Sequence, residues 1–330
     1  MNKPIIIIGS GKSALLHLNA YIKIWADREF PQIYIAPGDT IESEITDVVN
    51  THTANIKFTT PAELPELCRD NPVADICTPT ATHRAAIETM LRTGFQCFLV
   101  EKPLVTTAED FKWLASQKIR IEVMQNYLFS LATRRVLQLI QDHSIIPENA
   151  ASFFCKDRTQ DSLNKRGFYN GQPPHVFTVE LPHQLYLAEA FLGRAKINAA
   201  HAEDMLACGT VFTEHGTGII YLNHGDSESC TSSVNFSCLS SHKTIKKFII
   251  NATNGNILTI NYPVSKSNLT STIEVNGIGG AKREAFENDD MITAALKHYY
   301  DALNSNIGSN SFGSTGILIE AMAHEQGACL

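Results

Sequence analysis

The chain has 330 residues, of which 44% are hydrophobic and 18% are charged, a globular composition with core material for about two domains. Its net charge is -7 and no basic block occurs, which argues against nucleic acids and anionic membranes as partners. No apolar run approaches the ~18 residues of a membrane span, and the run at residues 5–8 is too short for the core of a signal peptide. A cytoplasmic protein is therefore expected.

Short apolar runs alternate with helical patterns over the first 124 residues. Continuous runs of this kind are expected of strands that are buried on both faces of a sheet. The predicted strands are residues 5–8, 33–36, 56–58, 74–77, 95–100 and 120–124, and the predicted helices include 82–93 and 107–117. The alternation indicates an α/β domain at residues 1–125, a Rossmann domain with a doubly wound parallel sheet.

A glycine-rich turn follows the first predicted strand and opens a helix. Its residues are Gly9, Ser10, Gly11, Lys12, Ser13 and Ala14. Gly9 permits the tight turn, Gly11 lets the backbone approach a pyrophosphate, and Ala14 allows close packing of helix on strand. The alternative is a nucleoside-triphosphate loop, which is rejected because Ile6 stands where that loop needs a glycine. Residues 9–14 are therefore predicted to bind a dinucleotide at the N-terminus of a helix.

The second predicted strand lacks the acid that normally binds the adenosine ribose of NAD. Ala36 and Pro37 occupy that place, and Asp39 comes late. Lys12, inside the glycine turn, is the nearest cation that a 2′-phosphate could meet. The sequence therefore favours NADP(H) over NAD(H) as the cofactor.

A charged pair and a proline, Glu101-Lys102-Pro103, follow the predicted strand 95–100. Ligands of open parallel sheets bind at the edge where the strands end. A lysine there can bind or polarise a substrate oxygen, whereas the alternative is a turn with one surface ion pair. Eight cysteines are scattered without a Cys-x-x-Cys pair, so free thiols and no metal site are predicted.

The pattern changes after residue 126, where the predicted strands become longer and more separated. They are residues 151–156, 195–202, 207–213, 218–223, 230–238, 245–251, 256–260 and 271–275. A helix at about 178–192 interrupts them, and two helices at about 289–304 and 314–326 end the chain. This order indicates an α+β domain at residues 126–330, with a mostly antiparallel sheet and a helix against one face.

Four segments together resemble the glucose–fructose oxidoreductase/inositol dehydrogenase (Gfo/Idh/MocA) family. They are the segment from Gly9 to Tyr21, the segment from Ala74 to His83, Glu101-Lys102-Pro103, and Gln125-Asn126-Tyr127. The resemblance covers the whole chain. It is strongest over residues 4–127 and in the last two helices, and looser from residue 150 to 290. It implies a Rossmann domain, and a C-terminal domain whose open-faced sheet forms the interface of a homodimer or homotetramer. It also implies NAD(P)-dependent hydride transfer on a small molecule.

The resemblance also implies roles for individual residues. Thr78 and Pro79 would line the nicotinamide side of the dinucleotide site, with His83 nearby. Glu101 and Lys102 would meet the cofactor ribose and the reacting carbon.

The second signature of the family reads roughly Asp-x-Gly-x-His-x-x-Asp and corresponds here to the segment from Val179 to Tyr186. His183 keeps the histidine and is predicted to donate or accept a proton. Both acids are replaced, which favours a less polar carbonyl or imine substrate over a typical sugar. Glu180, Tyr186 and Asn126 are candidate substrate contacts.

The sequence therefore predicts an NAD(P)-dependent oxidoreductase that acts on a sugar-like, cyclitol or imine substrate, with Lys102 and His183 as catalytic residues. The alternative is a non-catalytic NAD(P)-binding sensor or regulatory protein on the same scaffold, because a fold does not fix a function. A third reading is an enzyme that uses a tightly held cofactor for hydrolysis or elimination.

Overall fold

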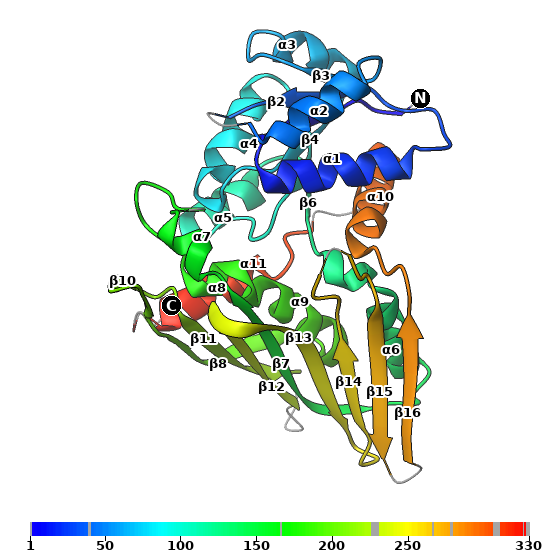
Figure 1. The fold of residues 1–330 in the computed structure, drawn as a ribbon, viewed down its shortest axis with the longest axis vertical. Helices are drawn as coiled ribbons and strands as arrows, with labels where there is room; N and C mark the ends of the chain where they lie inside the picture. Colours follow the sequence, from blue (N-terminus) through cyan, green and yellow to red (C-terminus); the bar gives the residue numbers. More distant parts are fainter. Residues whose placement is uncertain are drawn as a thin grey trace. The chain divides into compact units, whose positions relative to one another are not determined.

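The computed structural model describes residues 2–38, 41–165, 167–225, 231–265, 267–277, 280–305, 311–325 and 327. Asp39, which the sequence places late for a ribose contact, lies outside the described residues. The chain forms two compact units (Figure 1). The first comprises Met1–Asn126 and Ile292–Thr315, and the second comprises Tyr127–Met291 and Gly316–Leu330.

The first unit is built on a six-stranded parallel sheet with the strand order β3-β2-β1-β4-β5-β6. The strands are β1 (Ile5–Ile8), β2 (Ile33–Ala36), β3 (Ile56–Phe58), β4 (Val73–Ile76), β5 (Cys97–Val100) and β6 (Arg120–Val123). Strands β4 and β5 are buried at every position, as expected of a sheet covered on both faces. The prediction of a doubly wound parallel sheet is confirmed. Its strand order reverses between β1 and β4, where such sheets bind ligands.

Helices connect these strands. They are α1 (Lys12–Ile24), α2 (Ser43–Thr51), α3 (Leu64–Leu67), α4 (His83–Arg92), α5 (Ala108–Ser116) and the 3₁₀ turns Cys68–Asp70 and Thr80–Thr82. Helix α2 was not predicted, because only Ile45 and Val49 of its nine residues are buried and its apolar stripe is therefore narrow.

A helix from the end of the chain, α10 (Met291–Asn304), completes the first unit. The Tyr300 hydroxyl donates a hydrogen bond of 2.7 Å to the Lys3 carbonyl, and the Tyr300 ring packs edge-on against Trp25 at 4.9 Å between centroids. The Arg120 guanidinium donates to the carbonyls of Ala302 and Leu303. The sequence predicted one boundary near residue 125, and the structure adds this later return, which no local pattern reveals.

The second unit contains an eight-stranded sheet with the order β16-β15-β14-β13-β7-β12-β11-β8. Its strands are β7 (Pro147–Asp157), β8 (Ala195–Ala202), β11 (Thr217–His224), β12 (Thr231–Cys238), β13 (Ser240–Ala252), β14 (Ile257–Asn261), β15 (Ser271–Gly277) and β16 (Gly280–Phe286). All neighbouring strands are antiparallel except β7 and β12. The predicted mostly antiparallel sheet is confirmed.

Helix α9 (Leu181–Leu192) covers one face of this sheet. The Ser152 hydroxyl of β7 donates to the Gln184 side chain at 2.6 Å, and the rings of Phe191 and Phe248 lie 5.0 Å apart. On the opposite face Tyr221 and Ile257 remain exposed. The remaining helices are α6 (Leu131–Gln141), α7 (Thr159–Leu163), α8 (Val176–Val179), α11 (Thr315–Glu325) and the 3₁₀ turn Asn126–Phe129.

Three elements of the second unit differ from the sequence prediction. The strand predicted at 207–213 is a hairpin of β9 (Met205–Ala207) and β10 (Thr210–Phe212), because Cys208 and Gly209 turn the chain with positive φ. The helix predicted at 178–192 is interrupted at Glu180, just before Pro182. Strand β16 was not predicted, because six of its seven residues are exposed and its sequence lacks apolar alternation.

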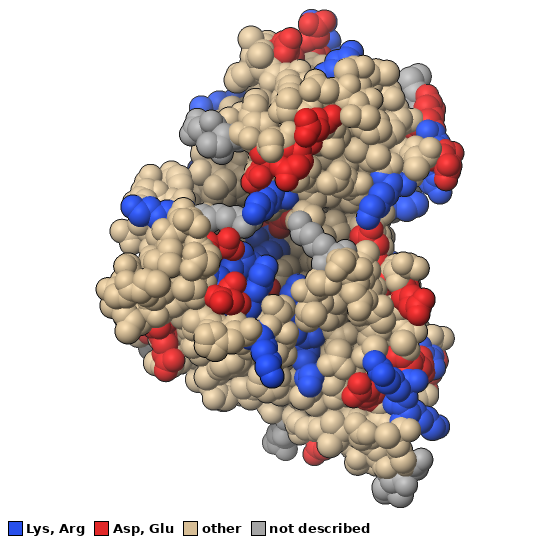
Figure 2. Space-filling view, viewed as in Figure 1, with Lys and Arg blue, Asp and Glu red and all other residues tan. Residues whose placement is uncertain are grey.

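Surface features of the second unit bear on its ligands. Lys and Arg side chains gather over the region of β7 and β13 on the face shown in Figure 2.

Within the described part of the chain, no helix has both the length and the apolar character that a membrane crossing requires.

Candidate active site

The glycine turn between β1 and α1 is closed on one side and open on the other. Gly9 has φ +112°, and a Cβ atom at this position would lie 3.0 Å from the Cys77 carbonyl oxygen. A Cβ atom on Gly11 would meet no described atom within 4 Å. Helix α1 has no side-chain cap and no acid in its first turn, as far as the described residues show. Its first N–H groups can therefore receive a phosphate that approaches past Gly11.

Ser10 fastens this turn to the loop after β2. Its hydroxyl oxygen accepts the Gly38 N–H at 3.1 Å, and its carbonyl accepts the Glu42 N–H at 3.0 Å. Ser10 is buried, so its side chain supports the turn from inside. Of the other predicted residues in the turn, Lys12 is exposed, Ser13 is half-buried and Ala14 is buried.

Thr78 and Pro79 follow β4 beside the glycine turn. The Thr78 hydroxyl is buried and has no hydrogen-bond partner among the described residues. Its methyl group would lie 3.4 Å from a Cβ atom on Gly9. A buried hydroxyl without a partner is unfavourable, so a ligand atom at this point would satisfy it. Pro79 is exposed.

His83 links two segments of the site from within the protein. It is fully buried, with Nε2 2.9 Å from the Thr78 carbonyl oxygen and Nδ1 3.0 Å from the Leu104 carbonyl oxygen. Burial lowers the pKa of His83, so the neutral ring donates to one of these two carbonyls. The structure therefore makes His83 a support for the Thr78 and Leu104 segments.

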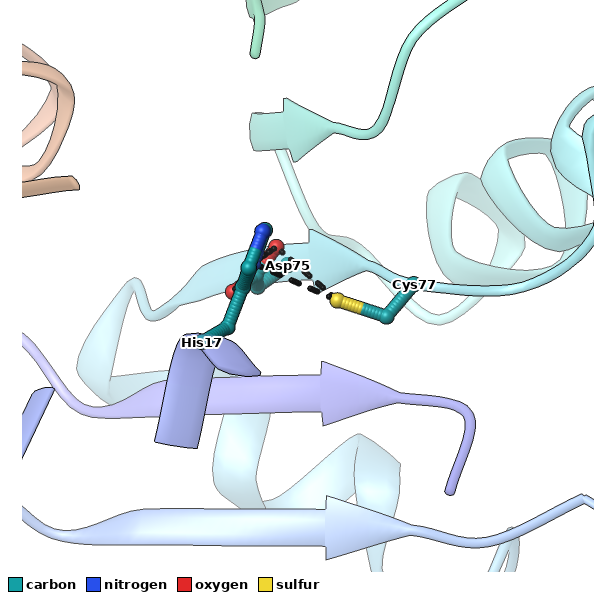
Figure 3. Close-up of side chains that lie close together, drawn as sticks. All are labelled: His17, Asp75 and Cys77. Atoms are coloured by element: carbon teal, nitrogen blue, oxygen red, sulfur yellow. Dashed lines mark hydrogen bonds and ion pairs between the residues drawn. The ribbon is translucent and has the colours of Figure 1, made fainter. Parts of the chain in front are cut away.

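Glu101 belongs to a buried polar network that the sequence did not reveal. Its carboxylate lies 3.0 Å from His17 Nε2, and the other ring nitrogen of His17 lies 2.9 Å from the Asp75 carboxylate. The Tyr21 hydroxyl donates to Asp75 at 2.9 Å, and the Cys77 sulfur lies 3.3 Å from His17 Nδ1. Figure 3 shows His17, Asp75 and Cys77, which come from helix α1 and from the end of β4.

Opposite charges dominate this network. Burial alone would lower the pKa of His17, but the charge of Asp75 and the hydrogen bonds raise it well above its ordinary value. Burial would likewise raise the pKa of Glu101, but the bond to His17 and the charges of His17 and Lys102 lower it. Burial and the nearby Asp75 raise the pKa of the Cys77 thiol to about 12. His17 is thus an imidazolium held between two carboxylates.

Lys102 is joined to this network through its backbone. Its N–H donates to the second carboxylate oxygen of Glu101 at 3.1 Å, and its side chain is half-buried. The signal that could have found the network is Asp75, an acid inside the apolar strand β4. A buried acid on such a strand needs a donor from a neighbouring element.

His183 is buried among aromatic rings in the second unit. Its Nδ1 lies 3.0 Å from the Tyr186 hydroxyl, which also accepts the Tyr127 N–H at 3.1 Å. The Tyr127 ring packs edge-on against the imidazole at 4.8 Å between centroids. When Tyr186 donates its proton to Nδ1, neutral His183 carries its own proton on Nε2. The structure thus brings His183 and Tyr186 together and makes Tyr127 a packing residue.

Glu180 and Asn126 are the remaining predicted substrate contacts. The Glu180 carboxylate is buried and accepts a hydrogen bond of 3.0 Å from Arg158, directly after β7. Asn126 is half-buried at the start of a 3₁₀ turn. Their contact with a substrate, and the joint action of Lys102 and His183, stay predictions.

Two groups of described residues bring three metal-ligating atoms within 4.8 Å of one another: His17 with Asp75 and Cys77, and His175 with Glu214 and Glu325. In the first group a proton already joins His17 to Asp75. In the second, His175 Nδ1 accepts the Phe177 N–H at 3.1 Å, so Nε2 of the neutral ring carries a proton and offers no lone pair. The absence of a metal stays a prediction.

Comparisons with known proteins agree with the fold of the first unit. Residues 3–123 match the family described as "Oxidoreductase family, NAD-binding Rossmann fold". No curated protein matches this chain in sequence.

Two solved structures share its fold across both units. One is KijD10, a 3-ketoreductase from Actinomadura kijaniata in complex with TDP-benzene and NADP, with a TM-score of 0.74, 14% identity and coverage of 98% of this chain and 96% of that one. The other is the UDP-N-acetylglucosamine 3-dehydrogenase GnnA from Acidithiobacillus ferrooxidans, with a TM-score of 0.73, 15% identity and coverage of 99% and 98%. KijD10 has also been solved as variants in which a lysine or a tyrosine is replaced.

Proposed function

We propose, from the premise that the Rossmann domain of this chain belongs to the Gfo/Idh/MocA oxidoreductase family, that the protein transfers a hydride between a nicotinamide cofactor and a small substrate. The reacting group is a carbonyl or hydroxyl carbon, or an imine. The observation that carries the proposal is the glycine turn at the switch point of the sheet, with Gly9 pressed against Cys77 and Gly11 facing open space.

The residues of the first unit fit NAD(P). The backbone of residues 9–14 would hold the pyrophosphate, and the unpartnered Thr78 hydroxyl would bind nearer the nicotinamide. When bound, the cofactor supplies or accepts the hydride. Glu101 holds the Lys102 backbone, and the Lys102 ammonium polarises the substrate oxygen.

The second unit supplies the proton in this proposal. Because Nδ1 of His183 is bonded to Tyr186, exchange with the substrate oxygen or nitrogen takes place at Nε2. Tyr186 fixes the imidazole and is itself held by the Tyr127 N–H. The relatives KijD10 and GnnA act on nucleotide sugars or carry their analogue, which supports a sugar-derived carbonyl here.

We further propose NADP(H) as the preferred cofactor, since no acid ends β2 and Lys12 is exposed at the start of α1. Glu42 is the residue that could oppose this, because its backbone N–H binds the Ser10 carbonyl and places an acid near the turn. A homodimer or homotetramer through the exposed face of the second sheet, and a cytoplasmic location, also stay predictions.

The test titrates the protein with NADPH and NADH by fluorescence and then follows absorbance with a panel of neutral sugars, sugar phosphates, sugar acids, inososes and cyclic imines. We expect Lys102→Met to reduce kcat by about 10²-fold or more while the Kd for NADPH changes less than about threefold. The matched control is Lys112→Met, an exposed lysine of α5 in the same unit, which should leave both constants unchanged.

Other outcomes separate the alternatives. Full activity in Lys102→Met contradicts the role of Lys102, and NADPH binding without turnover of any panel member favours the sensor. Turnover with no net change in absorbance favours hydrolysis or elimination. A preference for NADH above about tenfold, or 1.4 kcal/mol, contradicts the NADP proposal.

A further inference from the structure

Three basic side chains, Lys156, Arg158 and Lys246, lie at the end of the sheet face that α9 covers. Phe154 of β7 faces α9, because its ring centroid lies 6.3 Å from that of His183. Lys156 is two residues further along β7 and therefore points to the same face, and Arg158 directly follows the strand. Lys246 of β13 pairs with Phe154 and so stands diagonally opposite Lys156.

Lys246 connects this basic group, defined as Lys156, Arg158 and Lys246, to the proposed proton donor. Its ammonium nitrogen lies 5.5 Å from the centroid of the Tyr127 ring, within the range of a cation–π contact. The His183 imidazole packs edge-on against the same Tyr127 ring, with 4.8 Å between the ring centroids. Lys246 and His183 thus contact one aromatic ring, which places the basic group close to His183.

The positive charge of the basic group exceeds its counter-charge. Arg158 pairs with buried Glu180 at 3.0 Å and with Asp161 at 3.5 Å. Among the residues that the structure describes, three cations thus lie beside two carboxylates, and both terminal nitrogens of Arg158 face these carboxylates. Its Nε atom is buried and has no hydrogen-bond partner within the described ranges. Burial lowers the pKa of both lysines, and the charge of Arg158 adds to this lowering while Glu180 opposes it.

We propose that the basic group binds an oxyanion carried by the substrate, a carboxylate or a phosphate ester. Such a group offers several acceptor oxygens at once, which would satisfy the Arg158 Nε–H and balance the two ammonium groups. The substrate class is therefore an anionic carbohydrate-like molecule, such as a sugar acid or a sugar phosphate, and not a neutral sugar, cyclitol or imine. This inference rests on the proposed function only for the statement that the same molecule reacts beside His183.

Binding can be tested without turnover. Inorganic phosphate and acetate are titrated into the full-length protein by calorimetry at constant ionic strength. We expect saturable binding of at least one of them, weakened about tenfold or more in Lys246→Gln and in Lys156→Gln. The matched control is Lys247→Gln, which removes the same charge one residue along the same strand on the opposite face and should leave binding unchanged.

A second arm compares glucose, glucose 6-phosphate and glucuronate as substrates, which separates the two oxyanions. No binding of either anion at up to about 10 mM, or equal loss in Lys247→Gln, overturns the inference. The cofactor titration is independent: if NADPH binds and a neutral substrate turns over while the anions fail, only the anion site is wrong. If the anions bind and NADPH does not, the oxidoreductase proposal fails instead.

Discussion

At the scale of single residues, His17 is the least expected group in the first unit. An imidazolium in a protein interior is stable only if opposite charge surrounds it, and here Asp75 and Glu101 bond to its two ring nitrogens. The Glu101 carboxylate, which bonds to His17, also accepts a hydrogen bond from the Lys102 N–H. His17 is therefore a positioning residue for the segment that carries the proposed catalytic lysine.

The raised pKa of His17 predicts a dependence of stability on pH. The folded protein keeps the proton that the unfolded chain loses above pH ~6.5, so the contribution of His17 is complete below that pH and declines as the pH rises toward the folded pKa. We expect this contribution to fall by about 1 kcal/mol per pH unit between pH 7 and 8. Urea unfolding of the wild type and of His17→Gln at each pH gives the difference.

His17→Gln should also destabilise the protein by about 3 kcal/mol at pH 6.5, because it leaves buried carboxylates without their partner. The control is His201→Gln, because the His201 side chain is 67% exposed. This substitution should change neither the free energy of unfolding at pH 6.5 nor its decline between pH 7 and 8. If the wild type and His17→Gln lose stability in parallel between pH 7 and 8, His17 is not charged in the folded protein.

At the scale of elements, the two glycines of the turn between β1 and α1 have different roles. Gly9 is required by the fold, because its φ of +112° and its distance to Cys77 exclude a side chain. Gly11 is not required by the fold, because nothing described lies near its missing side chain. The first glycine shapes the turn and the second leaves space for a ligand.

Substitution by alanine should therefore have different effects on stability and on NADPH binding at Gly9 and at Gly11. Gly9→Ala should lower the free energy of unfolding by about 1–3 kcal/mol and weaken NADPH binding with it. Gly11→Ala should keep its stability within about 0.5 kcal/mol and still weaken NADPH binding tenfold or more. Thermal unfolding and fluorescence titration measure the two quantities. Equal affinity of Gly11→Ala and wild type would place the cofactor elsewhere.

Elements with a strong local signal could be predicted from the sequence. The six parallel strands are short continuous apolar runs, so their type and approximate bounds were predicted, whereas β16 has an exposed polar sequence and was not. The glycine turn and Lys102 lie in contiguous motifs. The His17 network needs α1, β4 and the end of β5 side by side, and the basic group needs the register of β7 on β13. Such contacts depend on topology, which one sequence does not display.

At the scale of the whole molecule, the path of the chain matters more than any one contact. It passes between the two units three times, after Asn126, Met291 and Thr315. Helix α10 covers Trp25 and binds the side chain of Arg120, so the cofactor domain depends on residues far from its own sequence.

A fragment of residues 1–126 should therefore be less stable than the same fragment joined to residues 292–315 by a flexible linker. Restored contacts of Tyr300 and Arg120 should add about 2 kcal/mol or more to the free energy of unfolding, since each is a hydrogen bond worth about 1 kcal/mol together with aromatic packing. Urea unfolding of both fragments measures this. Equal unfolding midpoints of the two fragments would mean that α10 does not stabilise the domain.

The late return of α10 also sets an order of events at the ribosome. The six strands of the Rossmann sheet leave the exit tunnel early, but the helix that seals Trp25 is translated only after nearly all of the second unit. The nascent Rossmann domain therefore lacks α10 while the second unit is synthesised. A ribosome that stalls or terminates before Met291 would release a chain in which that seal is missing, a natural substrate for chaperones and proteases.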